Sequence, residues 1–354
     1  MSTTDTLQVL GWKHFFQQQL ELDELETTRP VRVFSLSRHL LDVVGTEGPC
    51  QVTMPLAWQR HEVEERPTVG DWLLLEKESG DPLRLLERKS LFKRMASGRE
   101  TRVQLMAANV DTLFVVTSCN NDFNLSRIER YLAMALDAEV EPLLVLTKTD
   151  LCEDVESYVA QARTLRAGLE VVALNAKDAD GIEALRPWLG KGQTAALVGS
   201  SGVGKSTLVN SLCQDEVQLT GAIREADDKG RHTTTGRSLH LLPAGGLLLD
   251  SPGMRELQLS DCEAGVASLF DDFEELARQC RFNDCRHQGE KGCAIEEARE
   301  AGAIDERRLL NYLKLRDEQE RLAQTLVEKR RKDKDFGKMV KRAMKDIKRK
   351  KGEF

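Results

Sequence analysis

The sequence predicts an α/β protein in three parts: a small antiparallel β-barrel, a doubly wound and mostly parallel sheet, and a helical domain at the carboxyl end. Three observations lead to this prediction. Short strand-like runs separated by turn residues fill residues 30–89. From Val110 onward, apolar runs alternate with helical patterns, as in buried parallel strands joined by helices. Beyond Ser260 the pattern is helical and contains three clustered cysteines.

Shifts in composition divide the chain into five segments. These are an amino-terminal extension (1–29), a barrel followed by a basic linker (30–102), the α/β domain (103–260), a helical domain with the cysteine cluster (261–328) and a basic tail (329–354). In the barrel segment we expect the strands VRVFSL, LLDVVG, CQVTMP, DWLLLE and LRLLER. In the extension we expect only a short helix between Leu10 and Leu20.

The overall composition is that of an ordinary globular protein. Of 354 residues, 40% are hydrophobic and 31% are charged, which argues against wholesale disorder. No apolar run approaches the ~20 residues that a membrane span needs, and the amino terminus lacks the pattern of a secretion signal. We therefore expect a cytoplasmic protein, without a membrane partner, whose cysteines are reduced.

The net charge of −7 hides an asymmetry. Residues 329–354 carry 13 Lys and Arg but only 4 Asp and Glu, so the rest of the chain is strongly acidic. A basic tail on an acidic body predicts a polyanionic partner at one end of the molecule. A tail that serves solubility alone is the alternative.

The strongest chemical signal is a glycine-rich loop between the strand AALV and the helix TLVNSLC. It comprises Gly199, Ser200, Ser201, Gly202, Val203, Gly204, Lys205, Ser206 and Thr207. Glycines let backbone N–H groups surround phosphates at a helix amino terminus, a lysine reaches the terminal phosphates, and a hydroxyl coordinates Mg²⁺. We therefore expect a nucleoside triphosphate site, with Lys205 in a catalytic role on the phosphates and Ser206 on magnesium.

Two strand ends upstream of this loop predict a guanine site. The strand PLLVL leads into Thr147, Lys148, Thr149 and Asp150, where the carboxylate would accept from guanine N1–H and its amino group. The strand VVALNAK ends in Asn175, Ala176 and Lys177, which resemble the Ser-Ala-Lys element that contacts guanine O6. Threonine stands at position 147, where asparagine is usual, so we expect weakened nucleotide affinity with guanine preference kept. An accidental strand-end sequence is the alternative.

Downstream of the glycine-rich loop, the sequence predicts the elements that sense the terminal phosphate. Asp250 ends the strand GLLLD and begins Asp-Ser-Pro-Gly253, a D-x-x-G sequence, with indirect magnesium contact expected at Asp250. Thr234, in the sequence GRHTTT, could complete the magnesium shell. The position after D-x-x-G often holds a glutamine that orients the attacking water. Here it is Met254, so we expect slow intrinsic hydrolysis, with His232 as the candidate water-positioning residue. A solvent-exposed loop histidine is the alternative.

Clustered cysteines predict a structural zinc site. Cys280, Cys285, His287 and Cys293 offer three thiolates and one imidazole, which complete a closed tetrahedral shell. The other five cysteines are scattered along the chain. Free buried cysteines are the alternative.

The order of these elements is a circular permutation of a GTPase domain, which is tolerated because domain termini often lie close together. In this order, and in GSSGVGKST, RHTTT, DSPG and the cysteine spacing, the chain resembles the circularly permuted RsgA (YjeQ) GTPases that act on the small ribosomal subunit. The resemblance covers nearly the whole chain. It implies an OB-type barrel, a permuted P-loop GTPase domain and a zinc-containing carboxyl-terminal domain. Thr147 and the long amino-terminal extension depart from the family pattern and suggest a divergent paralogue.

The resemblance also implies a function. We expect a monomeric GTP hydrolase that binds the small (30S) ribosomal subunit and its 16S rRNA, assists late maturation and leaves on hydrolysis, stimulated by the subunit. Arg32, Arg38 and Arg60 offer RNA contacts in the barrel, although from residues alone they read more simply as surface charges. One alternative is a GTP-regulated protein–protein adaptor that binds no RNA. Another is an ATP-dependent P-loop enzyme.

Overall fold

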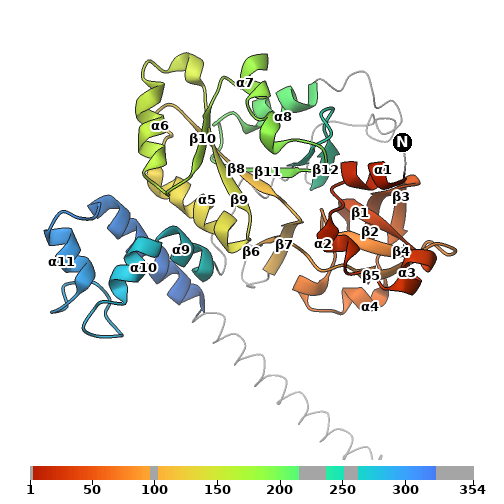
Figure 1. Cartoon of the computed structure of the whole chain (residues 1–354), viewed down its shortest axis with the longest axis horizontal. Coiled ribbons are helices and arrows are strands. Elements are labelled where there is room, and N and C mark those ends of the chain that lie inside the picture. Colours follow the sequence, from red (N-terminus) through yellow and green to blue (C-terminus); the bar gives the residue numbers. More distant parts are fainter. Residues whose placement is uncertain (1–2, 96–102, 215–236, 251–261, 324–354) are drawn as a thin grey trace, which may run out of the picture. The chain divides into compact units, whose positions relative to one another are not determined.

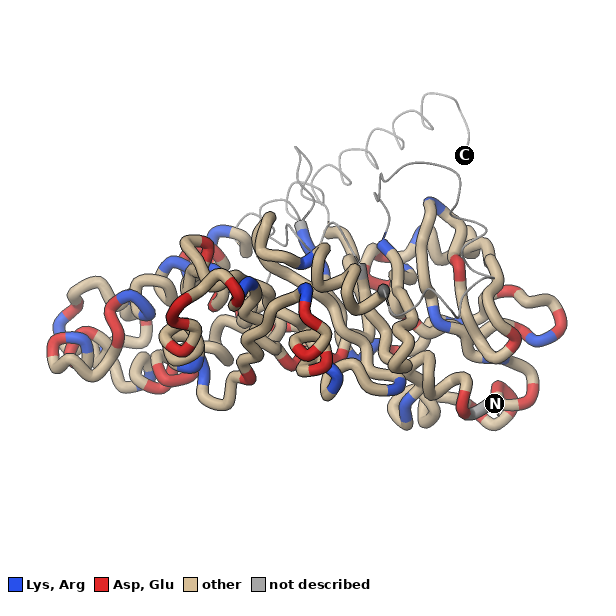
Figure 2. The backbone as a smooth tube through the Cα atoms, turned by 90° about the horizontal axis from the view of Figure 1, so that it is seen from above, with Lys and Arg blue, Asp and Glu red and all other residues tan. Residues whose placement is uncertain are grey.

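The chain folds into two compact units, Met1–Leu259 and Ser260–Phe354. The computed structural model describes residues 3–95, 103–214, 237–250 and 262–323 (Figure 1). Among these residues, no helix is long and apolar enough to cross a membrane. Basic and acidic residues are interspersed along the described backbone of both units (Figure 2). The predicted basic tail, 329–354, lies outside the described residues.

The first unit contains all five strands that were predicted for the barrel. They form an antiparallel ladder in the order β3-β2-β1-β4-β5. Their bounds are β1 Thr28–Ser37, β2 Leu40–Gly45, β3 Gly48–Thr53, β4 Trp72–Glu76 and β5 Pro82–Leu85, with short helices α4 Leu56–Gln59 and η1 Val63–Glu65 between β3 and β4. Alternating residues of β1, β2 and β4 bury one apolar core, among them Val33, Val43 and Leu73.

The amino-terminal residues pack onto these strands. They form three short helices, α1 Thr3–Val9, α2 His14–Gln17 and α3 Leu22–Thr27. Leu10 and Phe16 are buried with Trp72 of β4, and the rings of Trp12 and Trp72 meet edge to face, with centroids 4.8 Å apart. Aromatic contacts of this kind add to the burial of apolar area. The segment expected to hold one short helix therefore supplies part of the barrel's second core.

The segment expected to be a basic linker is partly a strand, which corrects that interpretation. Residues Leu91–Met95 form β6, which pairs antiparallel with β7, Val103–Ala108. Phe92 is buried, Lys93 and Arg94 are half-buried, and the pairing shifts register between Phe92 and Lys93, so a bulge lies in this basic strand.

The α/β domain contains the mostly parallel sheet that the sequence predicts. The order is β10-β9-β8-β11-β13-β12, and only β12 runs antiparallel to its neighbour. The bounds are β8 Thr112–Ser118, β9 Glu141–Thr147, β10 Glu170–Ala173, β11 Thr194–Val198, β12 Ser238–Leu241 and β13 Leu247–Asp250. At its other edge β12 pairs with β1 through Ser35 and Ser238, so the sheet continues into the barrel strands.

Helices cover both faces of this sheet (Figure 1). One face carries α5 Leu125–Asp137 and α6 Val155–Arg163, and the other carries α7 Ala179–Glu183 and α8 Lys205–Gln214. The short helices η2 Thr149–Leu151 and η3 Arg186–Trp188 follow β9 and α7. Phe114, Val145, Leu197 and Leu208 belong to the core beneath α7 and α8. The fold is thus a doubly wound α/β domain.

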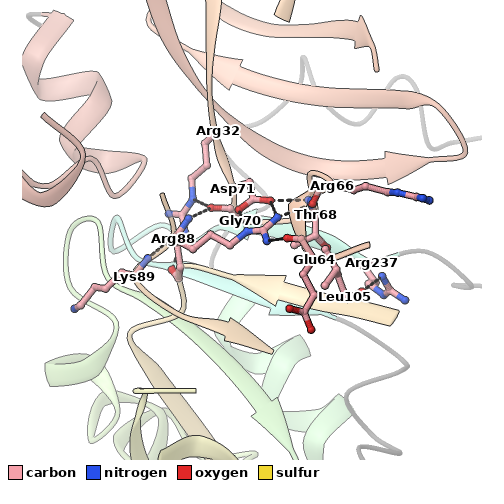
Figure 3. Close-up of polar contacts among 11 residues, drawn as sticks. Arg32, Glu64, Arg66, Thr68, Gly70, Asp71, Arg88, Lys89, Leu105 and Arg237 are labelled. Carbon is pink, nitrogen blue, oxygen red and sulfur yellow. Dashed lines mark hydrogen bonds and ion pairs between the residues drawn. The ribbon is translucent and has the colours of Figure 1, made fainter. Parts of the chain in front are cut away.

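A buried arginine ties the barrel strands to the helices before them and the sheet after them. Arg32 of β1 is 1% exposed. Its guanidinium donates to the carbonyls of Leu10 at 2.7 Å, Asn109 at 3.0 Å and Gly70 at 3.2 Å. Burial lowers its pKa to about 10, and the charge of Asp111 acts in the opposite direction. Figure 3 shows Arg32 beside Asp71, which is also fully buried. Arg32 therefore cannot contact RNA, contrary to its candidacy from the sequence.

Replacing Arg32 with methionine is expected to lower the free energy of unfolding by about 3 kcal/mol. The change leaves the buried carbonyls of Leu10 and Asn109 without this donor, and it removes one of the two cations that act on the buried Asp71. Urea denaturation followed by tryptophan fluorescence measures it, since Trp12 and Trp72 lie in the affected core. Arg60→Met, at an exposed barrel position, is the control. An equal midpoint for the two variants would contradict this account of Arg32.

The second unit is helical, as expected. Its helices are α9 Glu263–Leu269, α10 Asp271–Ala277 and α11 Ala294–Glu300, together with a helical segment over residues 306–323. The rings of Phe270, Phe273 and Tyr312 form the core, with centroids 5.4 to 5.9 Å apart. The cysteine cluster lies between α10 and α11.

Candidate functional site

The candidate site lies at one edge of the parallel sheet. Because β9, β10, β11 and β13 run parallel, their carboxyl ends meet at the same edge. Thr147 ends β9, Asn175 follows β10, Gly199 follows β11 and Asp250 ends β13. Segments that are distant in the sequence thus converge where open α/β sheets bind ligands.

The glycine-rich loop joins β11 to α8, as predicted. Gly199 has φ +146°, and a Cβ there would lie 2.1 Å from the carbonyl oxygen of Val116 in β8. Only glycine therefore allows the loop to pass so close to the neighbouring strand. Gly202 and Gly204 also have positive φ, at 82° and 98°. Helix α8 begins at Lys205, with Ser206 and Thr207 in its first turn, so its free N–H groups face the loop.

Lys205 is held inside the loop. Its ammonium group donates to the carbonyl of Gly199 at 2.6 Å and also to that of Ser200. The side chain is buried, at 7% exposure. A buried cation held on the loop's own carbonyls is placed to receive phosphate oxygens.

The predicted base-reading segment contacts the same loop. The Thr147 hydroxyl is buried and lies 2.5 Å from the carbonyl oxygen of Val203 and 3.1 Å from that of Thr117. Lys148 adopts a left-handed backbone, with φ 59°, and its ammonium group donates to the Gly202 carbonyl at 2.7 Å. Thr149 and Asp150 follow in η2, where Asp150 is exposed. Threonine at position 147 therefore keeps a hydrogen bond between the two segments.

The second base-reading segment is anchored to α8. Ser211 donates its hydroxyl to the carbonyl of Ala176 at 2.7 Å. The Asn175 side chain accepts from the backbone N–H of Lys177 at 3.1 Å, which closes a tight turn. Ala176 is buried, whereas Lys177 is exposed. The turn after β10 is thus fixed against the helix that carries Lys205.

Several predicted residues cannot be placed. His232, Thr234, Gly253 and Met254 lie outside the described residues. Asp250 is described only as the last residue of β13, where it pairs with Ser238 of β12.

The sequence analysis missed one residue at this edge, Arg127. It lies in the first turn of α5, and its guanidinium donates to the Ser200 hydroxyl at 2.6 Å. The Asp122 carbonyl accepts from it at 2.9 Å, and the Asp122 carboxylate lies 3.3 Å away. Arg127 therefore holds the second residue of the glycine-rich loop from outside. No sequence motif marks it, because its partner is 73 residues away.

In the second unit, the four predicted metal ligands are brought together. The ligand atoms of Cys280, Cys285, His287 and Cys293 all lie within 4.8 Å of one another. The Sγ of Cys293 lies 3.4 Å from His287 Nδ1 and 4.0 Å from Cys280 Sγ. A tetrahedral ion with metal–ligand bonds of about 2.0–2.3 Å needs separations of about 3.5–3.8 Å. The four side chains thus form a closed set that could hold a metal ion.

The surroundings of this cluster shift the pKa values of two of its side chains. Burial and the adjacent sulfurs raise the pKa of the Cys285 thiol to about 12, so a thiolate there needs a neighbouring positive charge. Burial lowers the pKa of His287, and the positive charge of Arg316 acts in the same direction, so the imidazole is held neutral, as a metal ligand must be.

Two protein-family models match the chain. The model for the RsgA GTPase matches residues 85–260, and the model for the 50S ribosome-binding GTPase matches residues 194–332. The first match spans β8 to β13, so it includes both base-reading segments as well as the glycine-rich loop. The second begins at β11 and includes neither base-reading segment.

Curated relatives match over most of their length. The chain is 50% identical to the small ribosomal subunit biogenesis GTPase RsgA 2 of Vibrio parahaemolyticus, over 98% of this chain and 95% of that protein. It is 48% identical to the small ribosomal subunit biogenesis GTPase RsgA of Mesorhizobium japonicum, over 90% and 91%.

Solved structures share the fold. YjeQ from Thermotoga maritima matches with a TM-score of 0.63 and 28% identity, over 82% of this chain and 98% of that one. YloQ, a circularly permuted GTPase, matches with a TM-score of 0.60 and 23% identity, over 83% and 95%. With these likenesses and the order of its site segments, the chain belongs to the RsgA family of circularly permuted GTPases.

Proposed function

We propose that this GTP hydrolase binds the small ribosomal subunit through its 16S rRNA, assists late maturation and leaves when GTP is hydrolysed. The observation that carries the proposal is the near full-length identity to proteins named for small-subunit biogenesis. The protein works as a monomer in the cytoplasm.

In the proposed site, one edge of the sheet binds the whole nucleotide. Asp150 accepts from the guanine N1–H and amino group, Lys148 packs along the base, and the turn at Asn175–Lys177 contacts O6. The loop from Gly199 to Thr207 surrounds the phosphates, with Lys205 on the terminal ones. The contacts of Thr147 and Lys148 with this loop support the assignment, because they join the base and phosphate halves.

Mg²⁺ accompanies GTP in a GTPase domain, and in this chain Ser206 would hold it, together with Thr234 and, indirectly, Asp250. The ion supplies charge stabilisation at the phosphates. For the cysteine cluster we propose Zn²⁺, because three thiolates and an imidazole suit this ion in a closed, structural shell.

Intrinsic hydrolysis is slow, because Met254 cannot orient a water molecule. We assign that task to His232, once the ribosomal subunit has positioned it. A protein–protein adaptor without RNA binding is not favoured, because the curated relatives are named for ribosomal subunit biogenesis.

The test is GTP hydrolysis by the purified protein, alone and with isolated small or large ribosomal subunits. We expect marked stimulation by the small subunit only, and Lys205→Ala should abolish it. We also expect tight subunit binding with a non-hydrolysable GTP analogue and weak binding with GDP. No stimulation, or equal affinity in both nucleotide states, would contradict the proposal.

A further inference from the structure

A cavity of about 660 Å³ lies in the first unit, among the barrel strands, β7 and the residue before β12. Three arginines line it: Arg38 from the β1–β2 turn, Arg66 from the loop before β4, and Arg237. Met54 and Leu105 contribute apolar surface. We call it the arginine cavity.

The described lining of the arginine cavity is positively charged. No aspartate or glutamate is among the described residues that line it. Arg38 has a left-handed backbone, with φ 53°, and no hydrogen bond or ion pair to any described residue. Burial lowers the pKa of Arg237, and the nearby positive charge of Arg94 acts in the same direction. Like charges gathered in a partly enclosed space favour the binding of an anion.

Arg66 is positioned by buried groups behind it (Figure 3). The Asp71 carboxylate accepts from Arg88 at 2.8 Å and from the backbone N–H of Thr68 at 2.7 Å. Arg88 in turn donates to the carbonyl of Arg66 at 2.5 Å and to that of Glu64. Asp71 is fully buried. This network fixes the backbone of the loop that carries Arg66, so the cavity is pre-formed.

Two further contacts complete the cavity. The Arg237 guanidinium donates to the carbonyl of Leu105 in β7, which leaves other donor atoms of the group for a ligand. Thr68, at the cavity lining, is 1% exposed, and its hydroxyl has no hydrogen-bond partner among the described residues. A buried unpaired hydroxyl is costly unless a ligand or water satisfies it.

We propose that the arginine cavity binds one nucleotide of a single-stranded RNA, with the phosphate between the arginines and the base against Met54 and Leu105. The volume is that of a small-ligand site, and its combination of cationic and apolar surface suits a nucleoside phosphate. This inference rests on the proposed function, which supplies RNA as the partner.

The cavity is also linked to the nucleotide site. Arg237 directly precedes Ser238, which pairs with Asp250 at the end of β13. RNA bound by Arg237 therefore lies one residue from the pairing of β12 with β13. At the end of β13 is Asp250, where we expect the indirect contact with magnesium.

The test measures the affinity of the full chain for a fluorescein-labelled single-stranded oligoribonucleotide by anisotropy, over a range of salt concentrations. Arg38→Ala and Arg66→Ala are each expected to weaken binding about tenfold and to reduce the salt slope by roughly 0.7. Arg163→Ala, at an exposed position at the end of α6 and outside the described lining of the cavity, should change the affinity less than twofold.

Equal losses in all three variants would overturn the proposal, because they would indicate a diffuse basic surface. Displacement of the RNA by inorganic phosphate or UMP at matched phosphate concentration would overturn the assignment to an RNA chain in favour of a free anion. Stimulation of hydrolysis by the small subunit is measured on the same variants. If it persists while cavity binding fails, the proposed function stands without the cavity.

Discussion

Asp150→Asn is expected to lower the affinity for GDP by roughly 1000-fold, because a neutral amide replaces the charged acceptor and its NH2 group faces the guanine amino group, donor against donor. Asp150 is exposed at the end of the sheet, so the fold should survive the change. The asparagine amide can donate to the carbonyl that xanthine carries at its second position. Part of the affinity should therefore return with XDP. Titration with fluorescent GDP and XDP measures both effects.

Glu153→Gln is the matched control for this variant. It removes one exposed carboxylate three residues further on and should leave the GDP affinity unchanged. The ATP-dependent alternative makes the opposite prediction, because an accidental TKTD sequence would not affect nucleotide preference. An Asp150→Asn variant that binds GDP as tightly as the unaltered chain would therefore remove guanine recognition from this segment.

Metal removal is expected to unfold the second unit while the first keeps its nucleotide affinity. The ligands Cys280 and Cys293 lie on either side of the loop between α10 and α11, and His287 has a left-handed backbone, with φ 60°. A closed thiolate–imidazole shell supplies folding free energy directly. Amide hydrogen exchange is measured in the presence of a strong chelator. The amides of α9 to α11 should lose their protection from exchange, whereas those of β8 to β11 should keep it.

Variants separate this effect from general damage by the chelator. Cys293→Ser should unfold the second unit without chelator, whereas Cys50→Ser, at an exposed barrel position, should not. Elemental analysis of the unaltered protein should give one zinc per chain. Full protection of α10 and α11 after complete metal removal would show that the apolar core of Phe270, Phe273 and Tyr312 holds this unit alone.

The meeting of the predicted site segments at one edge of the sheet could be expected from the sequence because each segment is local. The glycine-rich loop and the Thr147–Asp150 turn carry their chemistry within a few consecutive residues. Parallel strands then bring such segments to one edge without further information. The sheet was predictable for the same reason, since buried strands alternate with amphipathic helices.

Contacts that depend on distant backbone atoms could not be predicted. From the sequence, Arg32 resembles a surface charge. In the structure it donates hydrogen bonds to backbone carbonyls as far along the chain as Asn109, and such partners cannot be identified from residue types. Arg127 meets Ser200 only through the fold. Strand β6 could not be predicted because its basic residues, such as Lys93 and Arg94, give no alternating apolar pattern around the buried Phe92.

The pairing of β12 with β1 has a consequence for the growing chain. Ser35 leaves the ribosome early, but its partner Ser238 is made only after β11 and α8. Until then β1 has no partner at Ser35 on the side that β12 later joins, although β2 and β4 can already pair with it. Such late, long-range closure slows folding. During translation, therefore, the sheet closes onto the barrel strands only after the segments at 147–150, 175–177 and 199–207 have all been made.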